Sequence, residues 1–153
     1  MAFWLCILNR ENFETIKKEH VWGVAERHKK QISKAMSGEL CAFYLIAEGT
    51  GDNRKEPVIG GIAEIASETY EDLSDIFPSK RNPSDVYPYR VRLKSIKIFE
   101  PYVPFKPLTP HLNFITNKKN YSGHLLGKAM REIPKEDMRQ IPLMRDKWLG
   151  RSR

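Results

Sequence analysis

The stretch from Asn9 to Val24, NRENFETIKKEHVWGV, decides how the rest of the chain is interpreted. Trp22 follows a mostly charged or polar run, and Gly23 after it has no Cβ, so another group can approach the backbone closely. Ten residues before the tryptophan, Asn12 carries an amide that can donate and accept hydrogen bonds at once. A flat ring, an open backbone and an amide can together recognise a planar polar ring such as a nucleobase.

The same residues also allow a purely structural interpretation, which is the more common one for such residue types. Trp22 can fill the core, because buried aromatic side chains outnumber those that bind ligands. Asn12 can cap a short helix, since asparagine is a preferred N-cap residue. On this stretch alone both interpretations stay open.

Length and composition predict one soluble domain. The chain has 153 residues, 41% of them hydrophobic and 29% charged, which is ordinary for a globular protein with a real core. The longest apolar run, residues 40–47, is too short to cross a bilayer, and no signal peptide is visible. Cys6 and Cys41 lie in apolar runs and are predicted to be core residues. We expect a cytoplasmic protein, a monomer for preference, with one domain over residues 1–145 and a frayed basic tail over 146–153.

The charge balance favours an anionic partner. Lys and Arg total 26 against 19 Asp and Glu, a net charge of +7, which indicates nucleic acid first and a membrane surface second. Acidic residues cluster in 64–75 and basic residues in 80–97, so a positive face is predicted. Since nucleic acid ranks ahead of a membrane surface, we expect a nucleic-acid partner and no membrane partner.

Hydrophobic patterning predicts both strands and helices, and therefore an α+β fold. Apolar or alternating runs predict strands at 3–8, 40–47, 57–66 and 89–99. Gly60 and Gly61 predict a bulge or sharp bend in the third of these strands. Helices are predicted at 26–36, at 125–133 and from Pro134 onward, with one or two helical turns at 68–77. The proline-rich segments 79–88 and 101–110 are predicted to be irregular.

The strand predicted at 89–99 has a basic face. Val91 and Leu93 are expected inward, and the pattern shifts by one residue after Ser95, as a bulge would cause. Basic residues expected outward, where they can contact phosphates, are Arg90, Arg92, Lys94 and Lys97. Lys118 and Lys119, in a polar loop, are added to this predicted phosphate-binding set.

Motifs for catalysis are missing from the sequence. The four histidines lack metal-ligand spacing, and there is no CxxC, no Walker loop and no GxGxxG. We therefore expect no metal, no cofactor and no enzymatic activity. What remains is aromatic residues in loops among basic ones, where rings can stack on bases: Phe77, Tyr87, Tyr89 and Tyr121.

These segments carry a resemblance to a known family. FWLCILNRENFETIKKEHVWGV, the CAFYLI strand, the segment from Gly60 through Ser67 with Tyr70 and Asp72, YPYRVRL, and NKKNYSGHLLGKAMREI resemble the EVE domain family, in order, from Phe3 to about Ile141. The resemblance implies a PUA-like pseudobarrel, similar to the YTH domains that read methylated adenine. It also implies a non-enzymatic binder of modified bases, with methylated or hydroxymethylated cytosine in DNA as the leading ligands.

The resemblance assigns roles to several residues. Trp22 takes the place of the aromatic residue that forms one wall of the base pocket, and Asn12 that of the amide that bonds the ring edge. Gly23 stands where YTH domains have a small polar residue. Tyr121 stands where EVE relatives often have tryptophan. Either Phe77 or Tyr87 is a candidate for the second wall.

Two other readings stay open at this stage. One is an RNA-binding module that reads a modified RNA base. The other is a sensor or enzyme that uses the same pocket for a free nucleobase or nucleotide. A steep salt dependence of binding would separate polymer readers from a small-molecule sensor.

Overall fold

A computed structural model describes residues 1–80, 82, 84–125 and 127–152. Its strands are β1 (Phe3–Leu8), β2 (Val21–Val24), β3 (Leu40–Leu45), β4 (Val58–Ile65), β5 (Tyr70–Glu71), β6 (Tyr89–Pro104) and β7 (Met130–Ile133). Its α-helices are α1 (Arg10–Glu19), α2 (Lys29–Ile32) and α3 (Lys135–Ser152). Short 3₁₀ helices cover Glu26–His28, Gly51–Asn53, Lys106–His111 and Tyr121–His124.

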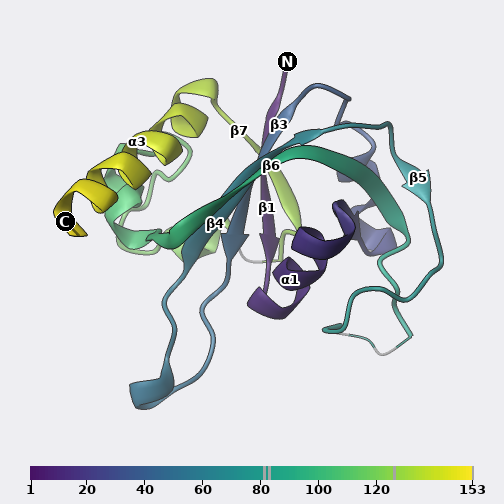
Figure 1. Ribbon diagram of the computed structural model, residues 1–153, viewed down its shortest axis with the longest axis horizontal. Coiled ribbons are helices and arrows are strands. Elements are labelled where there is room, and N and C mark those ends of the chain that lie inside the picture. The colour runs from purple at the N-terminus through teal and green to yellow at the C-terminus, as the bar shows by residue number, and fades with distance from the viewer. Residues whose placement is uncertain (81, 83, 126, 153) are drawn as a thin grey trace.

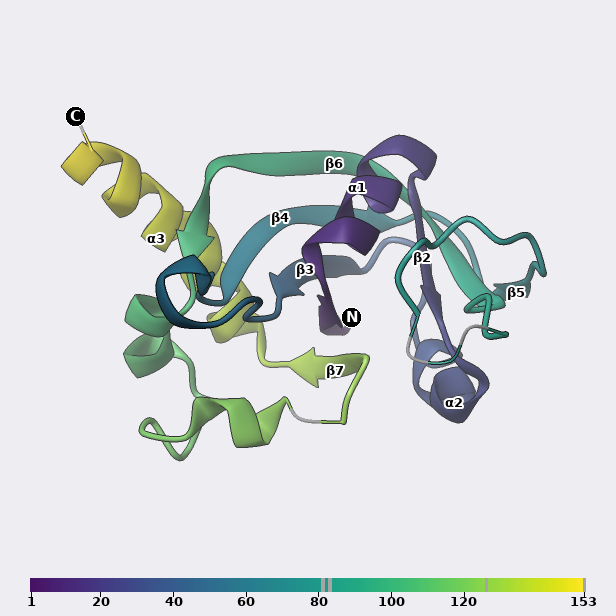
Figure 2. The ribbon, with the colours of Figure 1, turned by 90° about the horizontal axis from the view of Figure 1, so that it is seen from below.

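The strands form one seven-stranded mixed sheet that curls into a half-barrel (Figures 1 and 2). The order is β2-β6-β4-β3-β1-β7, and β5 also pairs with β6. Strands β1 and β3 are parallel, and the remaining pairs are antiparallel. The predicted α+β curved sheet with flanking helices is confirmed, and so are its four predicted strands.

Both faces of the central strands are buried, which explains why their sequences are apolar without alternation. Trp4 and Phe43 point into one core cluster, which α1 covers with Phe13 and Ile16. The alternate residues of the same strands, such as Tyr44, point to the other face of the sheet and pack in a second cluster with side chains of α3. In Figure 1, α1 and α3 accordingly lie well apart. The sheet is thus the common wall of two cores.

Two bulges interrupt the pairing of β4 with the long strand β6. Ser95 has a left-handed backbone with φ of 51°, and the register of β6 against β4 shifts there, which confirms the predicted change of phase. A second register shift lies between Ile59 and Gly61. A Cβ at Gly60 would come within 2.6 Å of the Phe13 ring, so glycine lets α1 pack against the bent sheet.

The helices predicted at 26–36 and 125–133 are corrected by the structure. The first is only a 3₁₀ turn followed by the four residues of α2. The second contains the strand β7, because these residues pair with β1 and cover its edge. Gly127, with φ of 75°, breaks any helix before β7. Tertiary pairing here overrides local helix propensity.

Three further expectations are corrected by the structure, wholly or in part. Residues 68–77 contain the short strand β5 and no helix, because the edge of β6 offers them a partner. Residues 101–110 are regular in part, since β6 continues to Pro104 and a 3₁₀ helix carries the later prolines. The helix predicted from Pro134 is confirmed, but it continues through Ser152 where a frayed tail was expected; residue 153 lies outside the described residues. None of the helices in the described ranges is long and apolar enough to cross a membrane.

Candidate functional site

A cavity of about 220 Å³ opens at the carboxyl end of β1. Among the residues that line it are Asn12 from α1, Trp22 and Gly23 from β2, and Phe77 and Tyr87 from the loop between β5 and β6. The structure therefore brings together all the residues predicted for the base pocket except Tyr121. Pockets for drug-sized ligands usually measure roughly 300–1,000 Å³, so this cavity suits a single small ring system.

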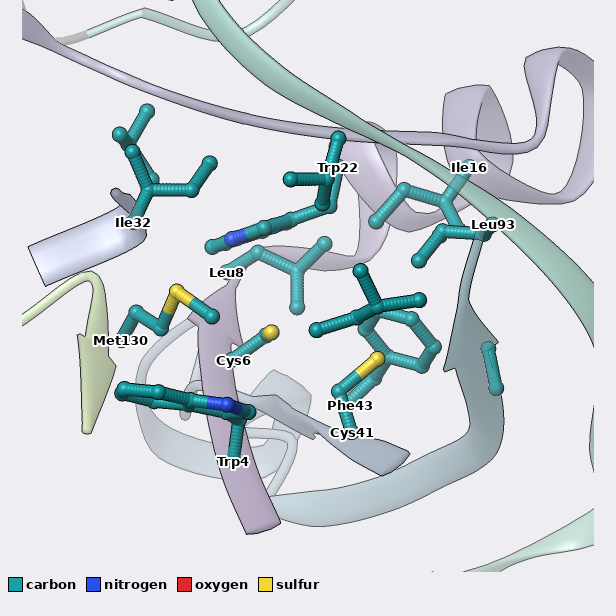
Figure 3. Packing of buried hydrophobic residues seen from close by; sticks show 14 of the residues in the cluster. Trp4, Cys6, Leu8, Ile16, Trp22, Ile32, Cys41, Phe43, Leu93 and Met130 are labelled. Carbon is teal, nitrogen blue, oxygen red and sulfur yellow. The ribbon is translucent and has the colours of Figure 1, made fainter. Parts of the chain in front are cut away.

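Trp22 belongs both to the core and to the cavity wall. Its side chain is 4% exposed and packs in the first core cluster, where Figure 3 shows the indole above Leu8 and near Ile32. Its Nε1–H is buried and has no hydrogen-bond partner among the described residues. Buried donors are nearly always paired, so an unpaired one at a cavity needs an explanation. An acceptor atom on a bound ring or a water molecule would supply it.

Asn12 does not cap α1. The N-cap is Asn9, whose side chain accepts a hydrogen bond from the Asn12 backbone N–H at 2.8 Å. The Asn12 amide instead pairs with the backbone of Ser79: Nδ2 donates to the carbonyl at 2.8 Å and Oδ1 accepts from the N–H at 3.1 Å. One N–H and one lone pair of the amide remain for a ligand. Asn12 therefore anchors the loop that carries Phe77 and Tyr87.

Gly23 is small because the protein itself fills the space beside it. A Cβ at this position would lie 3.0 Å from the Phe77 ring, 3.0 Å from the Tyr87 carbonyl oxygen and 3.1 Å from the Arg90 side chain. The close approach expected at Gly23 is thus made by the loop and β6. Glycine at this position lets the aromatic loop pack directly against β2.

Phe77 and Tyr87 form the aromatic side of the cavity. Their ring centroids are 5.6 Å apart in an edge-to-face arrangement, and Phe77 is 2% exposed. Tyr87 has a left-handed backbone with φ of 51°, which is rare for an aromatic residue and costs of order 1–3 kcal/mol. Asp85 stabilises this turn by accepting a hydrogen bond from the Tyr87 N–H at 2.8 Å.

Arg90 holds the same loop from beneath. Its Nε donates to the Tyr87 carbonyl at 3.0 Å and its Nη2 to the Val86 carbonyl at 2.8 Å, and both terminal nitrogens donate to Ser74. It also forms an ion pair with Asp72 at 3.4 Å. Arg90 is 1% exposed, so the prediction that it faces outward toward phosphates is wrong. Its physical role is to position the aromatic loop.

The rest of the predicted basic face is only partly free. Lys94 is exposed but lies 3.1 Å from Glu64 in an ion pair, because the acidic segment folds against the basic one. Lys80 pairs with Asp75 in the same way. Arg92 and Lys97 are exposed without an ion pair among the described residues, and Arg92 lies over the Tyr70 ring at 5.2 Å. Separate blocks of charge in sequence thus neutralise each other in the fold.

Residues of the NKKNYSGH loop lie at a second cavity. Tyr121 and Lys119 line it, away from Trp22. Lys118, predicted to contact phosphate, is exposed but lines neither of these two cavities, and its Nζ donates to the Leu112 carbonyl at 2.6 Å. The expectation that Tyr121 shares the pocket of Trp22 is therefore wrong.

The sequence interpretation missed two cations and a histidine at the first cavity. Arg27, His28 and Lys128 line it. The Arg27 Nε donates to the His28 Nε2 at 3.1 Å, and burial, followed by the charge of Arg27, lowers the pKa of His28. Arg27 and Lys128 each lay in a predicted helix, and nothing in the sequence placed them at the pocket. No group of three or more His, Cys, Asp or Glu side chains that could hold a metal is present among the described residues.

Comparison with known proteins gives consistent results in sequence and structure. The EVE domain family model matches residues 2–144. A UPF0310 protein of Pyrococcus abyssi is 48% identical over 141 residues, which cover 92% of this chain and 97% of that protein.

Two solved structures show the same fold at low sequence identity. Human THYN1, in complex with DNA containing 5-methylcytosine, has a TM-score of 0.64 at 14% identity, covering 95% of this chain and 98% of that one. The YTH domain of Zygosaccharomyces rouxii MRB1, in complex with N6-methyladenosine RNA, has a TM-score of 0.63 at 16% identity, covering 94% and 86%. The predicted PUA-like half-barrel is thereby confirmed.

Proposed function

Because the chain belongs to the EVE domain family, we propose that it is a nucleic-acid-binding module that reads a modified base in the cavity at Trp22. The base would enter flipped out of a duplex or from a single strand, because a closed cavity cannot surround a stacked base. Methylated or hydroxymethylated cytosine in DNA is the leading ligand. Structures of the same fold in complex with 5-methylcytosine DNA and N6-methyladenosine RNA support this class of ligand.

The observation that carries the proposal is a small aromatic cavity lined by Trp22, whose indole donor is buried with no partner among the described residues. Phe77 and Tyr87 line the same cavity as Trp22 and supply further aromatic surface. A ring that enters can stack on an aromatic face and accept a hydrogen bond at its edge. The remaining N–H and lone pair of Asn12 supply a second edge contact.

Phosphate contacts are assigned to the cavity rim first and to β6 second. Arg27 and Lys128 line the cavity and form no ion pair among the described residues. On β6, Arg92 and Lys97 remain exposed, whereas Lys94 is paired. Phosphate contacts would supply affinity, and the cavity would supply the choice of base.

The test is a binding array of matched DNA and RNA oligonucleotides, modified and unmodified, at one fixed salt concentration. The proposal expects one modified base to bind more tightly than its unmodified parent in the same sequence. Preference for N6-methyladenosine in RNA would move the assignment to an RNA reader. Equal binding of every modified and unmodified pair would refute the reader function. Tight binding of free nucleobases without salt dependence would instead indicate a small-molecule sensor.

A further inference from the structure

The second cavity, of about 440 Å³, lies beside the first and is larger. Ile7, Ile46, Gly127 and Lys128 line both cavities. We propose that this second cavity is a nucleotide subsite, with a base against Tyr121 and a phosphate at Lys119. This inference rests on the proposed function, and it takes the occupant to be the nucleotide next to the base held at Trp22.

The aromatic wall of the subsite is a cluster of three rings. Phe105 is buried beneath, with its centroid 4.7 Å from that of Tyr44 and 5.4 Å from that of Tyr121. Tyr44 is 4% exposed, whereas Tyr121 is only half-buried, so Tyr121 is the ring that a ligand can reach. An aromatic ring held rigidly by a second ring is a suitable platform for a base, because stacking accepts any base.

The charges at the second cavity favour an anion. Arg54, Lys119 and Lys128 line it, and no Asp or Glu is among its described lining residues. Arg54 is 2.9 Å from Glu56 in an ion pair, which leaves Lys119 and Lys128 as the cations without such a partner among the described residues. Burial, with the nearby negative charge of Glu56 as a lesser cause, raises the pKa of both Tyr44 and Tyr121, so both phenols stay neutral. Glu56 is not among the described lining residues, and its charge is paired with Arg54. A planar ring that carries a phosphate matches this combination.

The position of the two cavities suits neighbouring nucleotides of one strand. Leu8 and Trp22 lie in the first core cluster, whereas Tyr44 lies in the second, on the other face of the sheet. The cavities therefore lie on either side of the end of β1, with Lys128 lining both. Bases of a single strand can be splayed apart and stacked separately on aromatic side chains. Such a strand would cross the end of β1 with a phosphate near Lys128.

The first arm of the test is a length series. Oligonucleotides with one modified base, extended by one nucleotide at a time on either side, are titrated against the parent and two variants. We expect one added nucleotide to raise the affinity of the parent by about 5-fold to 150-fold, the range that one stacked base gives. Tyr121→Leu should lose this gain, Tyr121→Phe should keep it, and preference for the modified base should persist in both.

A matched lysine pair controls for nonspecific charge. Lys119→Gln should reduce the gain from the added nucleotide, because Lys119 lines the cavity. Lys118→Gln removes the same charge one residue away, where the side chain bonds the Leu112 carbonyl, and should leave the gain unchanged. Equal effects of the two substitutions would refute the phosphate assignment.

The second arm separates polymer from free nucleotide. Adenosine and cytidine monophosphate are titrated while the backbone amide resonances of Tyr121 and Ser122 are followed by NMR. Shifts there without any gain in the length series would assign the subsite to a free nucleotide. Neither shifts nor a gain would overturn the inference. If the parent shows no preference for any modified base, the proposed function fails, and the monophosphate titration still decides whether this subsite exists.

Discussion

Replacing Arg90 with methionine tests whether the aromatic loop depends on a buried guanidinium. Methionine keeps most of the apolar volume of the side chain and removes every donor. Arg90 is 1% exposed and donates to the carbonyls of Ser74, Val86 and Tyr87. Its loss leaves those acceptors without partners beneath the loop that carries Phe77 and Tyr87.

The expected magnitude follows from these contacts. A hydrogen bond to a charged group contributes about 1.5–3 kcal/mol. The individual values do not add up, because a loosened loop lets its carbonyls reach water. Leaving a buried acceptor without its partner costs about 1–3 kcal/mol, and Asp72, the ion-pair partner of Arg90, is itself partly exposed. We expect Arg90→Met to lower the free energy of unfolding by this amount, measured by urea denaturation.

Arg92→Met is the matched control on the same strand. Arg92 is exposed and contacts the Tyr70 ring, a contact of about 0.5–1 kcal/mol at such sites. Arg90→Met should therefore lose the preference for a modified base, whereas Arg92→Met should keep it and weaken binding to all sequences alike. If the two variants unfold at the same urea concentration and keep the same preference, Arg90 does not hold the loop.

Four further predictions concern the site and the fold. Asn12→Ala should lower the free energy of unfolding by about 1–3 kcal/mol, because the amide nitrogen and the amide oxygen each form a hydrogen bond with the Ser79 backbone. It should also reduce the preference between bases. A normal melting curve together with a normal preference would contradict both roles. Trp22→Phe removes the indole donor, which has no partner among the described residues, and should weaken binding of the preferred oligonucleotide by about 1–3 kcal/mol. A melting curve of the variant detects any loss of folding, and unchanged affinity would show that Nε1 contacts no ligand. Burial alone would raise the pKa of Glu39, but hydrogen bonds from the Trp4 indole and the backbone amides of Ala2 and Met36 outweigh it and lower the pKa. The free energy of unfolding should therefore fall as the pH drops below 4.5, the ordinary pKa of a glutamate. Glu39→Gln should flatten this dependence in acid denaturation curves. Purified protein should leave methylated and hydroxymethylated oligonucleotides intact by mass spectrometry, and catalytic loss of the modification would show it to be an enzyme.

The predictable part of the fold is the part in which local pattern and burial agree. The strands β1 and β3 are apolar throughout because both faces are buried, and the pattern alone located them. The bulge at Ser95 was visible as a change of phase in the sequence. By contrast, the sequence of β7 predicts a helix, and the segment is a strand because it pairs with β1.

The candidate site was predictable in its aromatic residues and not in its charges. Trp22, Phe77 and Tyr87 were singled out from sequence, and they line one cavity. Alternation on β6 placed Arg90 outward, but a loop folds over that end of the strand and buries it. Tyr121 was predicted to share a pocket with Trp22, but Trp22 packs in the first core cluster and Tyr121 against the second, on the other face of the sheet. Which loop covers which strand is a tertiary property that spacing along a chain does not contain.

The indole N–H resonance of Trp22 provides the most direct test of the proposed base pocket. Trp22 Nε1 has no partner among the described residues, whereas Trp4 Nε1 donates to Glu39 at 3.0 Å and serves as an internal control. On titration with the preferred modified oligonucleotide, the assigned Trp22 indole resonance should shift strongly and the Trp4 resonance should not. The unmodified oligonucleotide should produce a much smaller shift at the same concentration. Tight binding of the modified oligonucleotide with no shift at Trp22 would show that the base is read elsewhere.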